Sequence, residues 1–405
     1  MTETLPGTPA FPMERAARCP FDPPPELGRL QAEAPISRVE LWDGSQPWVL
    51  TRYDDVRAML SDPRISVDSD QPGYPHVSAG SAARRGRAKS FINLDDPVHA
   101  AQRRLLTSDF MVKKMELLRP RIQEIVDKLI DDMLAGPRPA DLVEAFALPL
   151  PSLVICELLG VPYADRGLFH RISKTIISRF STPEASVAAT DELLGYLGAL
   201  VEKKAVEPAG DLLSRLAVEQ VRTGQMTSAE VAAMGQLLLV AGHETTANMI
   251  ALGTVALLEH PDQLATIRDD GDPKLVANAV EELLRYLNIT HSGRRRVALE
   301  DLEIGGQLIR KGEGVIGAND IANRDETAFP DPDSLDVHRK ARHHVAFGYG
   351  VHQCLGQPLA RVELQVVYST LYRRIPTLAL AKPLAQLNFK HDMVVYGVHE
   401  LPVTW

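Results

Sequence analysis

The segment from Thr227 to Pro261 predicts one long helix, and this helix limits the folds that are open to the chain. Thr227 and Glu230 have the spacing of a capping box, and Pro261 supplies a stop. A helix between them has about 30 residues and is roughly 45 Å long, enough to cross a whole domain. Its residues are apolar nearly all round, which is typical of a buried central helix. His243 and Glu244 nevertheless stand in its middle, where burying them costs free energy.

The composition favours a helical, globular protein around that helix. Hydrophobic residues make up 45% of the 405 residues and aromatic residues only 5%, and this composition disfavours both a disordered chain and an all-β sandwich. The formal net charge is -9, which disfavours a nucleic-acid binder because such binding depends on neutralising phosphates. We therefore expect small molecules or other proteins as partners.

The cysteines and the N-terminal residues give expectations about the compartment. Cys19, Cys156 and Cys354 cannot form a disulfide framework, and their odd number favours a reducing compartment such as the cytoplasm. The N-terminus lacks the apolar run of a signal peptide or an anchor. The longest run without a charged residue or histidine is Thr245–Leu258, which is shorter than the roughly 18 residues of a membrane span. We expect a cytoplasmic protein that does not enter a membrane.

The organisation of the chain predicts one domain over residues 1–405, with residues 1–20 as a loose N-terminal arm, because no repeat or low-complexity linker divides it. The expected fold class is mainly α with a small, discontinuous β-sheet. The expected elements are, in chain order, a hairpin at 36–52, a long irregular loop at 62–92, helices from 96 to about 260, strands at 294–318 and a short β-rich tail after 376.

A second helix is expected to begin with Asp272 as its N-cap and Pro273 at its first position. Glu282 and Arg285 lie together on the face opposite to its apolar stripe. By spacing alone, this pair is compatible with an ordinary surface salt bridge.

Residues 347–356, FGYGVHQCLG, combine three glycines with a cysteine that directly precedes a helical pattern. Cys354 is therefore expected at a helix N-terminus, where free amide groups and the helix dipole stabilise a thiolate. A nucleophile, a metal ligand and the axial ligand of a haem are uses of such a cysteine. The ordinary alternative is a buried core cysteine, which is the interpretation we give to Cys156 and Cys19.

These motifs resemble those of the cytochrome P450 haem-thiolate monooxygenases. FGYGVHQCLG matches the haem-binding loop of that family at every defined position, AGHETT at 241–246 matches its oxygen groove, and Glu282-Leu-Leu-Arg285 matches its Glu-x-x-Arg helix. The resemblance covers essentially the whole chain and is greatest to the soluble actinobacterial members. It implies the cytochrome P450 fold, with the long central helix lying over a b-type haem.

The resemblance also implies roles for individual residues. Cys354 matches the axial ligand of the haem iron, and Glu244 with Thr245 matches the acid–alcohol pair that delivers protons to dioxygen. A Thr that is satisfied by its own helix and an ion-paired Glu are the structural alternative for that pair. The residues that match ligands of the haem propionates are His99, Arg103, Arg296 and His352, with Arg295 and His344 as further candidates.

The Glu282–Arg285 pair is implied to be internal and structural. Arg339 is our candidate for the third member, which would help to hold the cysteine loop. The resemblance also implies substrate contacts, for which an ordinary core residue is the structural alternative at each position. The positions implied to contact substrate are Ile92, Leu237, Leu238, Ala241, Asn248, Ile289 and Val394. Most are apolar, which suits a hydrophobic substrate, with Asn248 as a candidate hydrogen-bond donor.

The expected activity is hydroxylation of a bulky hydrophobic small molecule: a polyketide, macrolide, statin-like lactone, secosteroid or xenobiotic. Dioxygen is the co-substrate, and two electrons come from a ferredoxin and its reductase, because no flavin or nicotinamide fingerprint follows the cysteine helix. Arg104, Lys113 and Lys114 could form the docking patch of that ferredoxin, although a solvated charged face is the default interpretation. We expect a monomer.

Three alternatives differ in class from this activity. The first is a peroxide-driven haem-thiolate enzyme, which the Glu244-Thr245 pair disfavours. The second is a zinc protein with His343, His344, His352 and Cys354 as ligands, which lacks the usual paired spacings of a zinc site. The third is a helical scaffold without activity, which leaves the glycine-flanked cysteine without a purpose.

Overall fold

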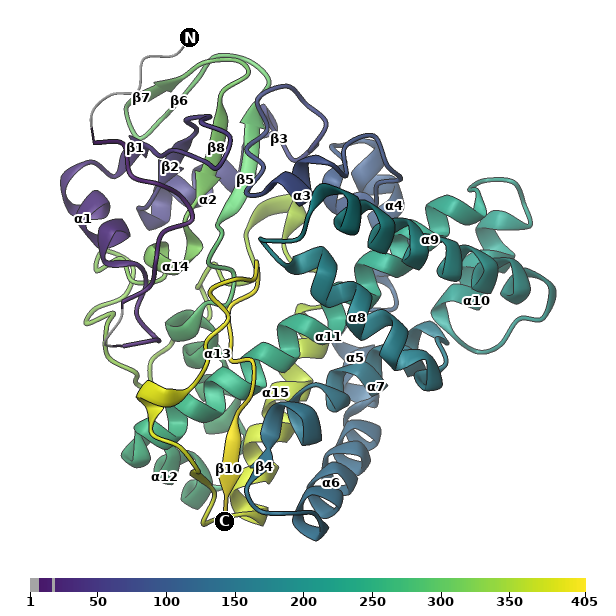
Figure 1. Cartoon of the computed structure of the whole chain (residues 1–405), viewed down its shortest axis with the longest axis vertical. Coiled ribbons are helices and arrows are strands. Elements are labelled where there is room, and N and C mark those ends of the chain that lie inside the picture. The colour runs from purple at the N-terminus through teal and green to yellow at the C-terminus, as the bar shows by residue number, and fades with distance from the viewer. Residues whose placement is uncertain (1–6, 17–18) are drawn as a thin grey trace.

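The computed structural model describes residues 7–16 and 19–405, and it places most helices on one side of the molecule and most strands on the other (Figure 1). Within these residues, no helix combines the length and apolar character that a membrane span requires. The helices are α1 Pro25–Glu33, α2 Tyr53–Ser61, α3 Ala79–Ala82, α4 Val98–Thr107, α5 Val112–Leu117, α6 Arg119–Ala135, α7 Pro149–Leu159, α8 Arg166–Ile177, α9 Pro183–Val206, α10 Leu212–Leu216, α11 Ser228–Glu259, α12 Pro261–Asp270, α13 Pro273–Leu287, α14 Asn319–Ala322 and α15 Gln357–Arg374.

Helix α11 is the long central helix that the sequence predicts, and it runs through the middle of the helical side (Figure 1). The Thr227 hydroxyl accepts a hydrogen bond from the Glu230 amide at 3.2 Å, and the Glu230 carboxylate accepts one from the Thr227 amide at 2.8 Å. This reciprocal capping box satisfies two amides that the first turn would otherwise leave unpaired. The helix ends at Glu259, before Pro261, and it packs against α7, α9, α13 and α15.

A close approach between α11 and α15 depends on Gly253. The Tyr368 hydroxyl of α15 donates a hydrogen bond to the Met249 carbonyl at 2.7 Å. A Cβ atom at Gly253 would lie 2.0 Å from that hydroxyl oxygen, closer than two nonbonded atoms can come. The missing side chain therefore lets the two helices lie close enough for the buried hydroxyl to reach the backbone of α11.

The sheets are small and discontinuous, as the sequence predicts. The largest has the strand order β1-β2-β8-β5-β3 and contains the expected hairpin, in which Ile36 pairs with Leu50. Strand β2 pairs in parallel with β8, while β5 pairs antiparallel with both β8 and β3. The strands are β1 Ile36–Arg38, β2 Trp48–Leu50, β3 Ile65–Ser66, β4 Ala140–Asp141, β5 Arg294–Ala298, β6 Leu302–Ile304, β7 Gln307–Ile309, β8 Gly314–Gly317, β9 Ala379–Leu380 and β10 Pro402–Thr404.

The N-terminal arm is more ordered than we expected. The Phe11 amide donates to the Glu40 carbonyl at 2.8 Å, and the Phe11 and Met13 side chains are buried. Arg15 is also buried, donates to the Asn288 carbonyl at 3.0 Å and lies 4.0 Å above the Tyr396 ring. Residues 10–15 thus belong to the packed structure because they bring apolar side chains and a cation to complementary sites. Residues 1–6 and 17–18 of the expected arm lie outside the described residues.

Replacing Gly253 with alanine should destabilise the protein by about 2 kcal/mol. Overpacking costs about 1–3 kcal/mol and the displaced Tyr368 hydroxyl loses its partner, which together exceed the gain in helix propensity of about 1 kcal/mol. Urea denaturation followed by circular dichroism measures the change. Gly195→Ala is the matched control, because Gly195 lies in α9 with no atom near its missing Cβ. That variant should be slightly stabilised, and equal effects of the two substitutions would contradict the proposed contact.

Candidate active site

Cys354 is held at the entrance to α15 by a tight glycine-rich turn. Its amide donates to the Phe347 carbonyl at 2.9 Å, and α15 begins three residues later at Gln357. Gly350 has a φ of 72°, and a Cβ atom there would lie 2.6 Å from the Leu60 carbonyl oxygen. Glycine is therefore required at this position both by the backbone conformation and by the contact with α2.

The surroundings of Cys354 contain several groups that stabilise a thiolate. Burial raises the pKa of the Cys354 thiol above its usual value. The charges of Arg294 and Arg103 and hydrogen bonds from the Gly356 and Gln357 amides lower that pKa in part. A metal ion bound to the sulfur would add the remaining stabilisation, because a coordinated thiol loses its proton.

A cationic edge, formed by Arg294, Arg295 and Arg296, lies beside the cysteine loop, residues 347–356. A cavity of about 120 Å³ is lined there by residues that include Ile92, His352 and all three arginines of 294–296. None of these arginines forms an ion pair with an acidic side chain of the described residues, and Arg294 and Arg296 donate to the backbone carbonyls of Ala346 and Arg295. Burial lowers the pKa of Arg296 to about 10. Such a concentration of unpaired cations predicts an anionic ligand.

His99 and Arg103 extend this edge from α4. The His99 and His352 rings lie with their centroids 4.0 Å apart. His99 is buried; its Nδ1 lies 2.9 Å from the Asp96 carboxylate, whereas its Nε2 has no hydrogen-bond partner. Arg103 donates to the Gln353 carbonyl in the cysteine loop. The four predicted propionate ligands therefore lie around the cysteine loop, and an unpaired buried nitrogen is available for a ligand.

Our further candidates for propionate ligands, Arg295 and His344, lie in different surroundings. Arg294, which we did not select, acts with Arg103 on the Cys354 thiol, and its buried Nε has no hydrogen-bond partner. Residues i and i+2 of a strand share a face, so the partner of Arg296 on β5 is Arg294 rather than Arg295. Arg295 also lines the cavity. His344 faces α13, because its Nε2 is 3.2 Å from the Glu281 carboxylate.

Helix α11 presents an accessible stripe near its middle, although most of its residues are buried. Leu237 and Thr245 are half-buried and Ala241 is exposed, whereas Leu238, Leu239, His243 and Glu244 between them are buried. These three residues are spaced by four and therefore share one face. The Thr245 hydroxyl donates to the Ala241 carbonyl at 2.6 Å, which is the groove geometry expected from the sequence. An open space thus lies beside the middle of α11.

Glu244 follows this stripe and is almost completely buried, at 8% exposure. Burial raises the pKa of the Glu244 carboxyl, but the His243 imidazole and the Lys390 ammonium lower it by more, so the pKa lies below its usual value. The carboxylate is therefore ionised at neutral pH. An acid beside a hydroxyl at an open groove can move protons, provided that the acid is reprotonated.

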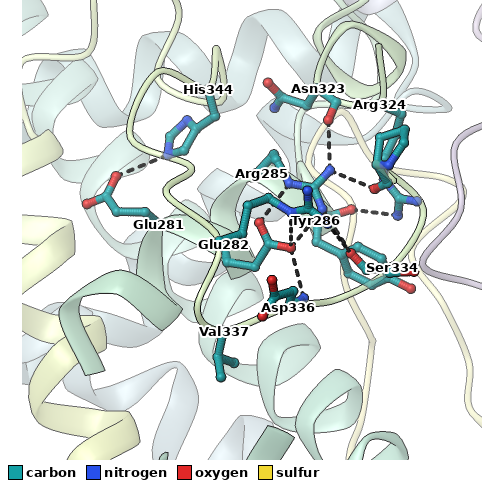
Figure 2. Close-up of polar contacts among 12 residues, drawn as sticks. Glu281, Glu282, Arg285, Tyr286, Asn323, Arg324, Ser334, Asp336, Val337 and His344 are labelled. Carbon is teal, nitrogen blue, oxygen red and sulfur yellow. Dashed lines mark hydrogen bonds and ion pairs between the residues drawn. The ribbon is translucent and has the colours of Figure 1, made fainter. Parts of the chain in front are cut away.

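The Glu282–Arg285 pair lies in the protein interior (Figure 2). Both side chains have 0% exposure and are joined by two hydrogen bonds of 2.7 and 2.8 Å. Arg339 adds a third contact, with its Nε 3.1 Å from Glu282. Arg285 also donates to three backbone carbonyls, those of Asn323, Pro332 and Ser334. The surface alternative is therefore wrong, because the meander 323–339 covers the pair.

A second buried carboxylate, Glu281, was missed by the sequence analysis. It pairs with His344 (Figure 2) and with Arg361 of α15, whose Nε lies 2.6 Å from the Glu281 carboxylate. Burial raises the pKa of Glu281, but these two partners reduce it to about 2. Arg361 also lies 4.7 Å from the centroid of the Phe347 ring. Glu281 thus connects α13 to the cysteine loop, and no spacing rule in the sequence indicates this contact.

These groups fit a haem. A thiol at a helix N-terminus can bind the iron, and the cationic edge with its unpaired nitrogens suits two carboxylates. The open stripe of α11 provides an apolar face. Residues 199–375 match the family described as Cytochrome P450, and the chain is 55% identical to cytochrome P450 GfsF of Streptomyces halstedii over 98% of this chain and 96% of that protein. The chain belongs to the cytochrome P450 family.

Solved cytochrome P450 structures have the same fold over nearly the whole chain. A crystal structure of GfsF has a TM-score of 0.91 and covers 98% of this chain and 100% of its own. MycCI of Micromonospora griseorubida, described as a mycinamicin VIII C21 methyl hydroxylase and bound to mycinamicin VIII, is 40% identical with a TM-score of 0.92, covering 98% and 100%. CYP105P1 in complex with filipin I is 43% identical with a TM-score of 0.91, covering 98% and 99%. The protein is a P450 monooxygenase of the type that acts on secondary metabolites or xenobiotics.

The residues expected to contact substrate are distributed unevenly in this P450. Leu237 and Ala241 lie on the open stripe, while Leu238 and Ile289 are buried at 7% and 9% exposure. Val394 is half-buried and donates its amide to the Ile177 carbonyl at the end of α8. Ile92 lies at the cationic edge instead.

Asn248 does not fit the role of a free substrate donor. Its Nδ2 donates to the Glu244 carbonyl at 2.6 Å. Its Oδ1 packs against Gly397, where an added Cβ atom would lie only 2.0 Å from this oxygen. The amide is therefore already used within α11 and packed against the C-terminal segment.

The zinc alternative finds no support in the P450 structure. Among residues 7–16 and 19–405, no three His, Cys, Asp or Glu side chains are grouped so that they could hold a metal ion. His343 stacks on Phe329 with ring centroids 4.3 Å apart, and its Nε2 lies 3.1 Å from the Ala328 carbonyl oxygen.

Glu282→Gln should destabilise the P450 by about 3–5 kcal/mol, because it leaves the Arg285 charge buried without its counterion. Urea denaturation measures this loss, and the fraction of protein that retains haem should fall with it. Glu116→Gln is the control, since the Glu116–Arg119 pair has the same spacing on the surface and is expected to contribute about 0–1 kcal/mol. Similar losses of unfolding free energy in both variants would show that the interior pair stabilises the protein no more than the surface pair does.

Proposed function

We propose that this P450 hydroxylates a bulky, largely hydrophobic small molecule, with a b-type haem bound through Cys354 and two electrons supplied by a ferredoxin. The single observation that carries the proposal is the environment of Cys354, where helix amides and the Arg294 and Arg103 charges converge on one thiol. When bound there, haem supplies dioxygen binding and the transfer of one oxygen atom to substrate. The residues of the chain bind this group, exclude water and move protons.

His99, Arg103, Arg296 and His352 would hold the two haem propionates. The unpaired Nε2 of His99 and the unneutralised charge of Arg296 support this assignment. Charge-assisted hydrogen bonds to carboxylates would satisfy both groups. Arg294 would be an additional member of the set, because it lies on the same face of β5 as Arg296.

Glu244 and Thr245 would deliver protons toward the open groove of α11. Glu244 is buried next to the accessible stripe, and the Thr245 hydroxyl lies within that stripe. The hydroxyl of Thr245 already donates to Ala241, so it can accept a hydrogen bond from a further group in the groove. This arrangement favours an enzyme that uses dioxygen and electrons over a peroxide-driven one, because proton delivery is needed when dioxygen is reduced.

The substrate would be a macrolide, another polyketide, a statin-like lactone, a secosteroid or a xenobiotic of comparable bulk. The apolar residues Leu237 and Ala241 face the open space beside α11. The segment around Val394 is fastened to the end of α8 by backbone hydrogen bonds and would form another wall. The structures of MycCI and CYP105P1, bound to mycinamicin VIII and filipin I, support the choice of a large lipophilic natural product.

The ferredoxin would dock on α4, α5 and the cysteine loop. Arg104 and Lys113 are exposed and form no ion pair within the described part of the chain, whereas Lys114 pairs with Asp109. Exposed apolar side chains accompany these cations: Val98, Met111 and Val351, at 51%, 56% and 58% exposure. Unpaired charge next to exposed apolar surface is typical of a transient interface. Val351 belongs to the loop that precedes Cys354, which would bring the electron donor close to the haem.

The haem assignment is tested by the absorption spectrum of the reduced protein under carbon monoxide. The wild-type protein should show the long-wavelength Soret band after which the family is named, and Cys354→Ser should lose or move this band because a hydroxyl is a weaker ligand than a thiolate. Cys156→Ser is the control, since Cys156 lies in the apolar core with a pKa raised by burial to about 12. An unchanged band in Cys354→Ser would exclude this cysteine as the ligand.

The docking surface is tested by reversing two charges. Arg104→Glu together with Lys113→Glu should reduce ferredoxin-driven turnover by about tenfold at low salt, because the variant repels an acidic partner. Reduction of the haem by dithionite should stay unchanged. The control reverses Lys274 and Lys311, two exposed lysines on α13 and in the turn before β8. Equal turnover of the two double variants would place the ferredoxin on another surface.

A further inference from the structure

His243 is a fully buried histidine with one free nitrogen next to Glu244. Its side chain has 0% exposure, and its Nδ1 lies 2.7 Å from the Leu239 carbonyl oxygen. Because a carbonyl can only accept, Nδ1 carries a hydrogen, and Nε2 is the nitrogen that is left to take up or release a proton. Nε2 has no hydrogen-bond partner and lies 3.6 Å from the Glu244 carboxylate. A buried polar nitrogen without a partner is unusual and needs a reason.

The groups around Glu244 come from three elements. His243 lies on α11 itself, Lys390 belongs to the C-terminal segment, and His170 lies on α8. The His170 ring is centred 5.3 Å from the His243 ring, and its Nε2 is 2.9 Å from the Ser152 hydroxyl of α7. His170 is only half-buried. A line of titratable groups therefore leads from the α7–α8 surface through His243 to Glu244.

The protonation states of Glu244 and His170 indicate that this line of groups can carry protons. Glu244 is ionised at neutral pH, because its cationic neighbours lower the pKa of the carboxyl. Burial, together with the charge of His243, lowers the pKa of His170 to about 4, so this ring is neutral in the resting protein. A carboxylate that acts as a proton donor must regain a proton after each turnover. Within the described residues, the His243 Nε2 is the only basic side-chain nitrogen that lies within 4.0 Å of this carboxylate.

We propose that His243 reprotonates Glu244, with His170 at the outer end of the route from solvent. In this step a proton taken up at His243 Nε2 passes to a Glu244 carboxylate oxygen, breaking one N–H bond and forming one O–H bond. The imidazole returns to its neutral form, held in place by the Leu239 carbonyl. This inference rests on the proposed role of Glu244 and Thr245 and adds the source of their protons.

The first test measures the protonation of Glu244 in the haem-loaded enzyme. His243→Phe keeps the ring volume and removes both nitrogens. Infrared titration of the Glu244 carboxyl, identified by subtracting the spectrum of Glu244→Gln, should show a higher pKa in His243→Phe than in the wild type. An unchanged titration would overturn the contact between the two groups. A merely structural role of His243 would not move this band.

The second test measures coupling, the product formed per pair of electrons consumed. His243→Phe should lower coupling by about tenfold and release more peroxide, with a larger solvent isotope effect, because general acid–base steps contribute factors of that order or more. His260→Phe is the matched control. His260 follows the last residue of α11, and its Nδ1 also lies 2.7 Å from the carbonyl four residues before it. His260 lies at the C-terminal end of α11, whereas Glu244 lies in its middle. Replacing His260 should therefore leave coupling unchanged.

Two further variants separate the possible failures. If His243→Phe binds no haem, His170→Phe tests the outer end of the route and should lower coupling by itself. If Glu244→Gln lowers coupling while His243→Phe and His170→Phe do not, the relay is wrong and the role of Glu244 stands. If Glu244→Gln leaves coupling unchanged, the proton-delivery role in the proposed function is wrong, and the relay with it.

Discussion

The buried ion pair between Glu282 and Arg285 fixes the segment that leads to the cysteine ligand. Removing two charges from water is costly, and the cost is offset here because every contact has good geometry and Arg285 bonds to three carbonyls of the meander. One of those carbonyls belongs to Asn323, whose side chain accepts the Val345 amide at 2.8 Å. Two residues later, the Phe347 carbonyl accepts the Cys354 amide. The position of the thiol therefore depends on a pair of charges located on α13.

The polar groups of the site are placed by elements that are otherwise apolar. Helix α11 is buried along most of its length and still carries His243, Glu244 and Thr245 in one turn. Strand β5 holds three arginines and is fixed between β3 and β8. In both elements, rigid neighbours hold charged or polar side chains where water cannot freely solvate them. This arrangement supports proton movement and anion binding because the groups need little rearrangement.

Much of the fold follows from local signals in the sequence, and the failures have physical reasons. The bounds of α11 and the start of α13 were predicted because capping residues and prolines act within one turn. The burial of Glu282 could not be derived from spacing, since a surface pair has the same spacing and only the meander decides between them. Arg294 could have been found from the period of a strand. The backbone hydrogen bond from Phe11 to Glu40 joins two segments whose pairing no local pattern indicates.

The parallel pairing of β2 with β8 joins two strands that are synthesised at very different times. Trp48 pairs with Val315, so the first strands leave the ribosome long before their partner does. At about 5–20 residues per second, this delay is on the order of 15 to 50 seconds. The helices between them can form from local contacts during that interval, whereas β5 with its arginines obtains both neighbouring strands only afterwards. The cationic edge that would bind the haem propionates is thus completed late in synthesis. Haem would therefore bind to a chain in which the helices have already formed.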